Sequence, residues 1–172
     1  MKKFTNLLVN QQMKKLVDAL KFENVIKSEE VYNAMLYTDR GDFTESKYAY
    51  MDSPQYIDYN ATISAPHMHA YAMEYLKEYL KPGKKCLDVG SGSGYLTVAF
   101  SRLMKDEGIS VGIEHIPGLY EFGKKNIEKN NKELAAASTL EVDVKKKLKN
   151  TSNKEAAVEI GKRIAEKAVK AG

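Results

Sequence analysis

A glycine-rich stretch at residues 84–95, KKCLDVGSGSGY, constrains the fold of this chain more than any other feature. Apolar and β-prone residues at 86–89 predict a short buried strand, and Pro82-Gly83 marks a turn before it. Three alternating glycines then let the backbone bend tightly and lie close to a ligand. Residues 95–104 carry apolar side chains at helical spacing. A strand, a glycine-rich loop and a helix predict a doubly wound α/β fold with a nucleotide-like ligand at the strand ends.

The glycine spacing distinguishes between the ligands that such a loop can bind. A dinucleotide loop needs a third glycine where Tyr95 stands, and the Gly-Lys-Ser/Thr ending of a P-loop is absent here. The chain has an acid, Asp88, followed by a G-x-G-x-G pattern, which resembles the first motif of class I S-adenosylmethionine-dependent methyltransferases. A second predicted strand ends at Glu114, an acid placed to accept hydrogen bonds from ribose hydroxyls. A chance Gly/Ser-rich loop is the alternative, which the strand context and the two acids disfavour.

Composition and charge describe a soluble, single-domain chain of 172 residues, 43% hydrophobic and 29% charged. A single cysteine excludes a disulfide framework within the chain and a multi-cysteine zinc site, so we expect a cytoplasmic protein. Because no apolar run approaches the roughly 20 residues of a membrane span, we expect no membrane partner. The charge of +4 is uneven: residues 145–172 carry 9 Lys/Arg and 3 Asp/Glu, which leaves −2 for residues 1–144.

A predicted helix from Pro66 to about Leu80 follows a short extended segment at residues 61–63. Ser64 is placed to cap this helix, and the free N–H groups at its start can attract a carboxylate. His67 and His69 are two positions apart and so point to different faces of a helix. This spacing, together with the absence of a HExxH pattern, predicts no metal site.

Several segments together resemble the protein-L-isoaspartate(D-aspartate) O-methyltransferase family. They are VYNAMLYTDR (31–40), YMDSPQ (50–55), ATISAPHMHA (61–70) and LDVGSGSGYLT (87–97), and the resemblance covers about residues 12–132. It implies S-adenosyl-L-methionine as cofactor, with S-adenosyl-L-homocysteine as product. It also implies methylation of the free carboxylate of L-isoaspartyl and D-aspartyl residues, which begins the repair of damaged proteins. The expected enzyme is a cytoplasmic monomer whose partners are isoaspartyl-containing proteins and peptides.

The resemblance also assigns roles to residues of this chain. Ser64 matches the family's active-site serine. The implied cofactor-binding residues are Ala61, Thr62, Ile63, His69, Asp88, Gly90, Ser91, Gly92, Gly94 and Glu114. A carboxylate is already a competent nucleophile toward a sulfonium methyl group, so the reaction needs positioning and exclusion of water rather than a strong base. The lack of a catalytic triad or a metal cluster in the sequence is therefore expected.

The last part of the chain departs from the family pattern. Residues 140–144 can pass for a strand, but no glycine follows Asp143, so only the strands at 85–89 and 109–114 are secure. Residues 138–172 resemble part of a bacterial large-subunit ribosomal protein that binds 5S ribosomal RNA. An apolar stripe within them predicts an amphipathic helix, formed by Ala157, Ile160, Ile164 and Ala168.

The two resemblances suggest a chimera, a recombined or generated sequence, or a truncated gene with a foreign tail. In each case the expected fold is a truncated class I (Rossmann-like) methyltransferase with an N-terminal helical segment. Residues 1–132 form the methyltransferase part, and residues 133–172 form a basic, mostly helical segment of different origin. Truncation would leave apolar surface of the sheet uncovered. The alternative function is a non-catalytic protein whose basic residues 145–172 contact ribosomal RNA. That alternative is weaker because the segment holds no aromatic residue on which bases could stack.

Overall fold

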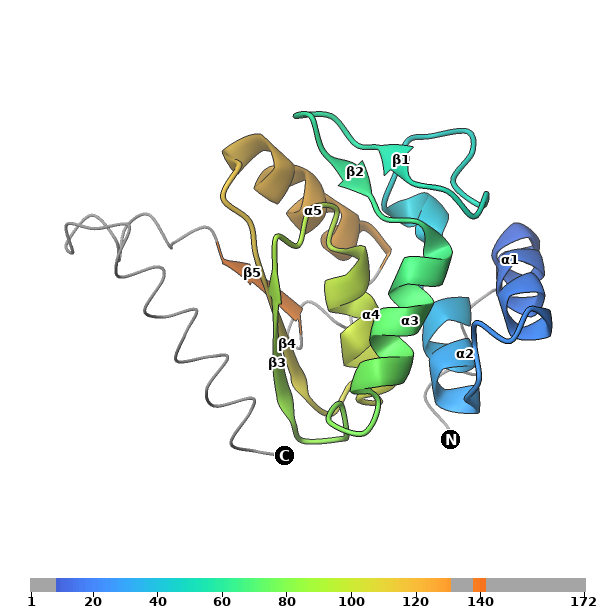
Figure 1. Ribbon diagram of the computed structural model, residues 1–172. Helices are drawn as coiled ribbons and strands as arrows, with labels where there is room; N and C mark the ends of the chain where they lie inside the picture. Colours follow the sequence, from blue (N-terminus) through green and yellow to red (C-terminus); the bar gives the residue numbers. More distant parts are fainter. Residues whose placement is uncertain (1–8, 131–137, 142–172) are drawn as a thin grey trace. The chain divides into compact units, whose positions relative to one another are not determined.

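The computed structural model describes residues 9–130 and 138–141 (Figure 1). The predicted amphipathic helix and the proposed RNA-contacting residues 145–172 lie outside the described residues. The described elements belong to one compact unit that extends to Glu141. In chain order they are α1 (Gln11–Phe22), α2 (Glu29–Leu36), η1 (Arg40–Asp42), β1 (Gln55–Tyr56), β2 (Thr62–Ile63), α3 (Pro66–Leu76), β3 (Lys85–Val89), α4 (Tyr95–Leu103), β4 (Ile109–Ile113), α5 (Pro117–Asn130) and β5 (Ser138–Glu141).

The two N-terminal helices begin at polar residues. Asn10 caps α1, because its side-chain oxygen accepts hydrogen bonds from the N–H groups of Gln12 and Met13 at 2.9 and 3.4 Å. Ser28 occupies the N-cap position of α2, but its hydroxyl makes no capping bond. That hydroxyl instead donates to Glu74 Oε1 at 2.9 Å and so links the start of α2 to α3.

A three-stranded parallel sheet in the order β3-β4-β5 forms the centre of the α/β part. Leu87 of β3 pairs with Val111 of β4, and Gly112 of β4 pairs with Leu140 of β5. The expectation of only two secure strands is therefore wrong. A third strand needs only backbone partners and β-compatible residues, and the absence of a glycine after Asp143 did not prevent it. The boundary at residues 132–133 stays a prediction.

Helices α3, α4 and α5 all lie on one side of this sheet (Figure 1). A single apolar core joins them to α1 and α2, with Met13, Met35, Met73, Val98 and Met104 all fully buried. Apolar side chains on the opposite face of β3 are exposed: Leu87 is 39% exposed and Val89 is 74% exposed. Among the described residues, no strand pairs with the outer edge of β3.

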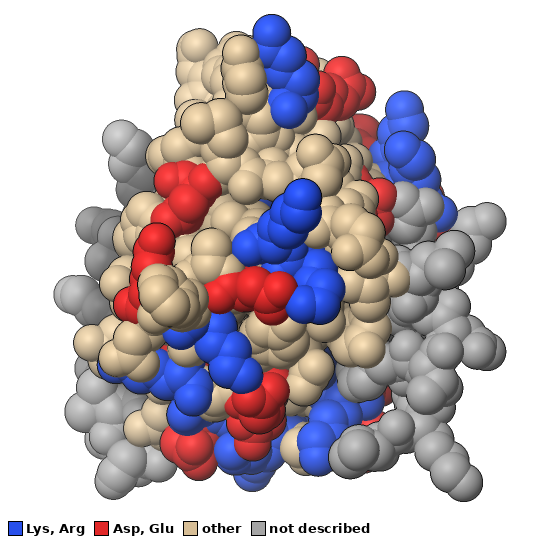
Figure 2. Space-filling model, turned by 90° about the vertical axis from the view of Figure 1, so that its right-hand side faces the viewer, with Lys and Arg blue, Asp and Glu red and all other residues tan. Residues whose placement is uncertain are grey.

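The surface, the helices and the distribution of potential metal ligands give three further observations. On the face turned toward the viewer in Figure 2, basic side chains are interspersed with acidic ones. None of the helices described is both long enough and apolar enough to span a bilayer. The part of the chain that the structure describes also contains no cluster of three or more potential metal-ligating side chains.

Candidate functional site

A cavity of about 250 Å³ opens between the carboxyl end of β3, the glycine-rich loop and the start of α3. Eight of the eleven predicted site residues line it, from Ser64 on one side to Asp88 on the other. The complete lining is Thr62, Ile63, Ser64, Met68, His69, Ala72, Asp88, Gly90, Ser91, Gly92, Ser93, Tyr95 and Leu96. The predicted residues that do not line it are Ala61, Gly94 and Glu114.

The glycine-rich loop has the backbone conformation that its sequence predicts. Gly90, Gly92 and Gly94 have φ values of +82°, +53° and +84°, in the left-handed region that residues with a Cβ rarely adopt. The loop is fastened to the sheet because the N–H groups of Gly90 and Ser91 both donate to the carbonyl of Ile113. Gly94 serves packing rather than the cavity: a Cβ there would lie 3.1 Å from Ile127 of α5.

Asp88, which lines the cavity at the end of β3, is a partly buried acid with no basic partner among the described residues. Its Oδ2 accepts a hydrogen bond of 2.7 Å from the Thr97 hydroxyl. Burial raises the pKa of Asp88; the Thr97 hydrogen bond opposes this effect, and the nearby charge of Glu114 adds to it. A carboxylate in this environment gains most from a positively charged ligand, so the site favours an ammonium group beside Asp88.

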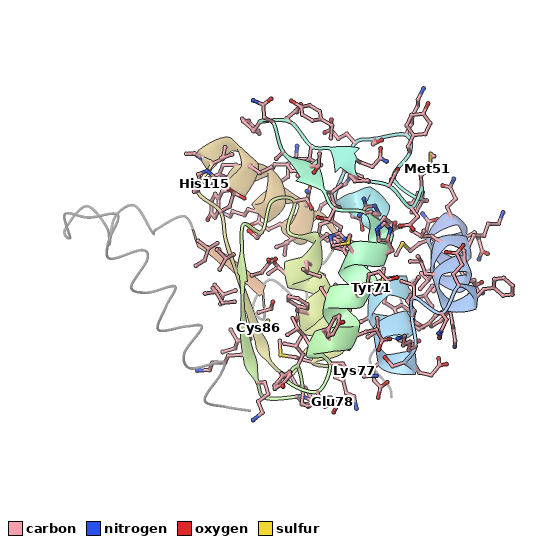
Figure 3. The ribbon with its side chains drawn as sticks, viewed as in Figure 1. Met51, Tyr71, Lys77, Glu78, Cys86 and His115 are labelled. Atoms are coloured by element: carbon pink, nitrogen blue, oxygen red, sulfur yellow. The ribbon has the colours of Figure 1, made fainter. Side chains whose placement is uncertain are left out.

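Glu114 organises the loop from behind the cavity wall. Its Oε2 accepts a hydrogen bond from the N–H of Gly92 at 3.1 Å. Its Oε1 accepts from the N–H groups of His115 and Ile116 at 2.7 and 3.0 Å. The side chain is 4% exposed, whereas the neighbouring His115, marked in Figure 3, is 83% exposed. Backbone groups therefore already engage both oxygens that the sequence analysis assigned to ribose.

The start of α3 differs from its sequence-based prediction. The N-cap residue is Ala65 rather than Ser64, and its side chain makes no capping hydrogen bond. Pro66 has no N–H, the N–H of His67 donates to Asp52 Oδ1 at 2.9 Å, and that of Met68 donates to the Ala65 carbonyl. The prediction that free N–H groups at the start of α3 bind a carboxylate is therefore wrong. The N–H groups of His67 and Met68 already donate to Asp52 and to the Ala65 carbonyl.

Ser64 is nevertheless well placed for contact with a ligand. It is exposed, it lines the cavity, and it follows directly after β2. Thr62 is also exposed on this wall, while Ile63 between them is buried, as alternation along an extended segment requires. Because Ser64 does not cap α3, its hydroxyl is available to a ligand in the cavity.

The sequence analysis missed several lining residues, of which Tyr95 is the largest. Tyr95 is fully buried and stacks on His69, with ring centroids 4.6 Å apart. Burial, together with the charge on Arg40, lowers the pKa of His69 to about 3, so its ring is neutral near pH 7. Met68 and Ala72 lie four positions apart on the predicted helix and so share one face of it, which could have been inferred from the sequence. Ser93 and Leu96 could have been inferred as neighbours of the loop glycines.

Three polar atoms of the cavity-lining residues are buried without a hydrogen-bond partner in the described structure. They are His69 Nδ1, Ser91 Oγ and the Tyr95 hydroxyl. Buried polar groups are normally satisfied, so unpartnered atoms around a cavity indicate a polar occupant. Together with the acid at Asp88, these atoms fit a ligand that has an ammonium group and additional polar groups.

Comparison with known proteins places the chain in context. The family model described as protein-L-isoaspartate(D-aspartate) O-methyltransferase matches residues 11–154. A protein-L-isoaspartate O-methyltransferase of Caenorhabditis elegans is 52% identical over 118 residues, which are 69% of this chain and 52% of that protein. The Arabidopsis thaliana protein-L-isoaspartate O-methyltransferase 1 is 47% identical over 129 residues, which are 74% of this chain and 56% of that protein. The chain thus spans about half the length of the curated relatives it matches.

A solved structure gives the same relationship in three dimensions. It is a crystal structure from Plasmodium falciparum, described as a protein-L-isoaspartate O-methyltransferase in complex with S-adenosyl-L-homocysteine. It is 35% identical to this chain, with a TM-score of 0.74, and the similarity covers 87% of this chain and 69% of that one. The fold is therefore that of a class I methyltransferase. The sequence match also continues to residue 154, beyond the resemblance that the motifs indicated.

Proposed function

The chain belongs to the protein-L-isoaspartate(D-aspartate) O-methyltransferase family, and on this premise we propose that it transfers a methyl group from S-adenosylmethionine to isoaspartyl carboxylates. The acceptors are L-isoaspartyl and D-aspartyl residues of damaged proteins, so the reaction initiates protein repair. One observation carries the proposal: an exposed serine, Ser64, and a partly buried acid without a basic partner among the described residues, Asp88, line the same cavity of about 250 Å³. The first suits an acceptor carboxylate and the second a cationic cofactor.

On the cofactor side, this chain supplies charge and shape. The carboxylate of Asp88 holds an ammonium group, and the bend of the loop through Gly90 and Gly92 leaves room for the ligand beside the backbone. The unpartnered atoms of His69, Ser91 and Tyr95 supply further hydrogen bonds. Glu114 keeps lone pairs free beside its backbone contacts, through which we propose that it also holds ribose hydroxyls. When bound, the cofactor supplies an electrophilic methyl group on a sulfonium.

On the acceptor side, Ser64 orients the nucleophile. Its hydroxyl donates a hydrogen bond to one oxygen of the acceptor carboxylate, which leaves the other oxygen free to attack. A carbon–oxygen bond forms as the carbon–sulfur bond breaks, and no proton has to move, since an ionised carboxylate attacks and an ester results. Orientation within the cavity therefore accounts for the rate advantage, rather than a base.

The decisive measurement is methyl transfer to an isoaspartyl peptide and to its normal aspartyl twin. We expect incorporation of methyl groups only into the isoaspartyl peptide, and its loss in Ser64→Ala. Calorimetry with S-adenosyl-L-homocysteine tests the cofactor side separately. Equal labelling of both peptides would contradict the proposed specificity, and no binding at millimolar ligand would contradict the proposed cofactor. The monomeric state and the cytoplasmic location stay predictions, which sedimentation and fractionation test.

A further inference from the structure

Arg40, in η1, has an unusual environment for a charged side chain. It is completely buried, and burial lowers its pKa. Its hydrogen bonds go to backbone carbonyl oxygens: Nε–H donates to Ala49 at 2.8 Å and Nη2 donates to Ser53 at 3.4 Å. Its Nη1 is buried and has no partner among the described residues. Burial of a guanidinium costs free energy. We therefore ask which groups Arg40 positions through its hydrogen bonds.

The guanidinium also lies close to Tyr95, one of the residues that line the cavity. Arg40 Cζ lies 5.9 Å from the centre of the Tyr95 ring, within the range of a cation–π contact. Tyr95 in turn stacks on His69, and the edge of Phe43 packs against it at 5.4 Å. Tyr95 and His69 both line the cavity. A continuous stack therefore leads from the backbone of residues 49–53 through Arg40 and Tyr95 to His69.

Residues 49–53 are also joined to the acceptor side of the cavity by a second route. Asp52 accepts hydrogen bonds from the backbone and ring of His67, next to the cavity residue Met68. Met51, labelled in Figure 3, is 54% exposed on this segment. The segment thus presents an exposed side chain to solvent while its inner carbonyl groups are held by the Arg40 fork.

We propose that Arg40 is a positioning residue that holds residues 49–53 as a preformed docking surface for the acceptor peptide and keeps His69 oriented in the cavity. This inference rests on the proposed function. A planar fork with several donors can hold two carbonyl groups and stack on a ring at once, which a lysine cannot. Small displacements of groups that position a substrate reduce the rate strongly, so the buried cation is explained by its effect on substrate geometry.

The test uses the full chain and two substitutions that separate charge from shape. Arg40→Lys keeps the cation and loses the fork, whereas Arg40→Met loses both. Val17→Ala is the matched control, since it loosens the buried α1–α2 part of the core and leaves the stack intact. Hydrogen exchange reports the amides of Ala49, Met51 and Ser53, each of which donates to a carbonyl within its own turn. Steady-state kinetics and calorimetry report the peptide KM and the cofactor Kd.

We expect exchange of these three amides to accelerate on the order of tenfold in both Arg40 variants, and not in Val17→Ala. The peptide KM should rise about tenfold in both, as for the loss of about one hydrogen bond, while the S-adenosyl-L-homocysteine Kd stays within about twofold. In Arg40→Met, where a nearby positive charge is removed, the pKa of His69 should rise, and in Arg40→Lys it should stay low. The ring resonances of His69 in NMR follow this titration.

Two results would overturn the inference. One is exchange at residues 49–53 that accelerates no more in the Arg40 variants than in Val17→Ala. The other is a cofactor Kd that rises by the same factor as the peptide KM, which indicates general loosening rather than positioning. Exchange and titration need no turnover, so they decide the inference even if the wild-type chain methylates no peptide. If Arg40→Met does not fold, exchange in Arg40→Lys decides it alone.

Discussion

The carboxylate of Asp52 clamps His67 at the start of α3. Asp52 Oδ1 lies 2.9 Å from the backbone nitrogen of His67, and both carboxylate oxygens lie 2.9 Å from its ring Nδ1. A carboxylate beside a helix N-terminus satisfies an otherwise unpaired N–H and interacts favourably with the helix dipole. The residue that caps this helix is therefore 15 positions away in the sequence, in the segment that Arg40 also holds.

Asp52→Ala should lower the free energy of unfolding by about 1 kcal/mol, the usual cost of losing a side-chain cap. Asp52→Asn should retain most of that stability, because an amide oxygen can still accept from the His67 N–H. Urea unfolding of the two variants beside the wild type measures the difference. Equal stability of Asp52→Ala and the wild type would show that the contact contributes nothing to the fold.

Ser64→Ala should leave stability within about 0.5 kcal/mol of the wild type, because this exposed residue does not cap α3. Methylation of an isoaspartyl peptide should nevertheless fall strongly, since the hydroxyl that orients the acceptor is gone. Ser64→Asp should abolish transfer in a folded protein, because a negative charge would repel the incoming carboxylate. Circular dichroism checks that the Ser64→Asp variant is folded. Full methylation by that variant would exclude the catalytic role of this residue.

The sequence predicted the centre of the site because that centre is local. The strand, the three glycines and the helix of residues 85–103 follow each other in the chain, and left-handed φ values require glycine wherever they occur in it. Asp88 was found for the same reason, whereas Ser64 was identified through the motif at residues 61–70, since its local prediction as the cap of α3 was wrong. Both residues lie within or beside a motif, and the structure places both on the wall of the cavity.

The remaining features depend on contacts between distant segments. The cap of α3 by Asp52 and the stack of Arg40 on Tyr95 each join residues that no local pattern connects. Arg40 appeared only as part of a motif, because arginine is rarely fully buried and no local pattern predicts its burial. A strand at residues 140–144 was considered but not counted as secure, because no glycine follows Asp143. The strand β5 at Ser138–Glu141 is instead fixed by backbone pairing with its neighbour β4.

Glu114→Gln should destabilise the chain by about 1–3 kcal/mol even without ligand. The buried carboxylate accepts from three backbone N–H groups, and an amide offers one acceptor oxygen and places an N–H₂ group among donors. Glu121→Gln is a control on an exposed position of α5 and should change stability little. Thermal unfolding compares the three proteins. A Glu114→Gln variant as stable as this control would mean that Glu114 does not support the loop and would leave ligand binding as its function.

Asp88→Asn should affect stability and cofactor binding in opposite directions near neutral pH. Because burial raises the folded-state pKa of Asp88 above its ordinary value of 3.8, folding favours the protonated acid. The stability that this group contributes is fully present below pH 3.8 and is lost as the pH rises through the raised folded pKa. Asparagine stays neutral and can still accept from the Thr97 hydroxyl.

The ligand-free variant should therefore gain stability relative to the wild type between pH 4 and pH 7, as urea unfolding at the two values would show. Binding of S-adenosyl-L-homocysteine should weaken by about tenfold or more at pH 7, because the ammonium group loses its charged partner. In the wild type, the affinity should rise with pH as Asp88 ionises, and in Asp88→Asn this pH dependence should disappear. A variant that binds the ligand as tightly as the wild type at pH 7 would remove Asp88 from the cofactor site.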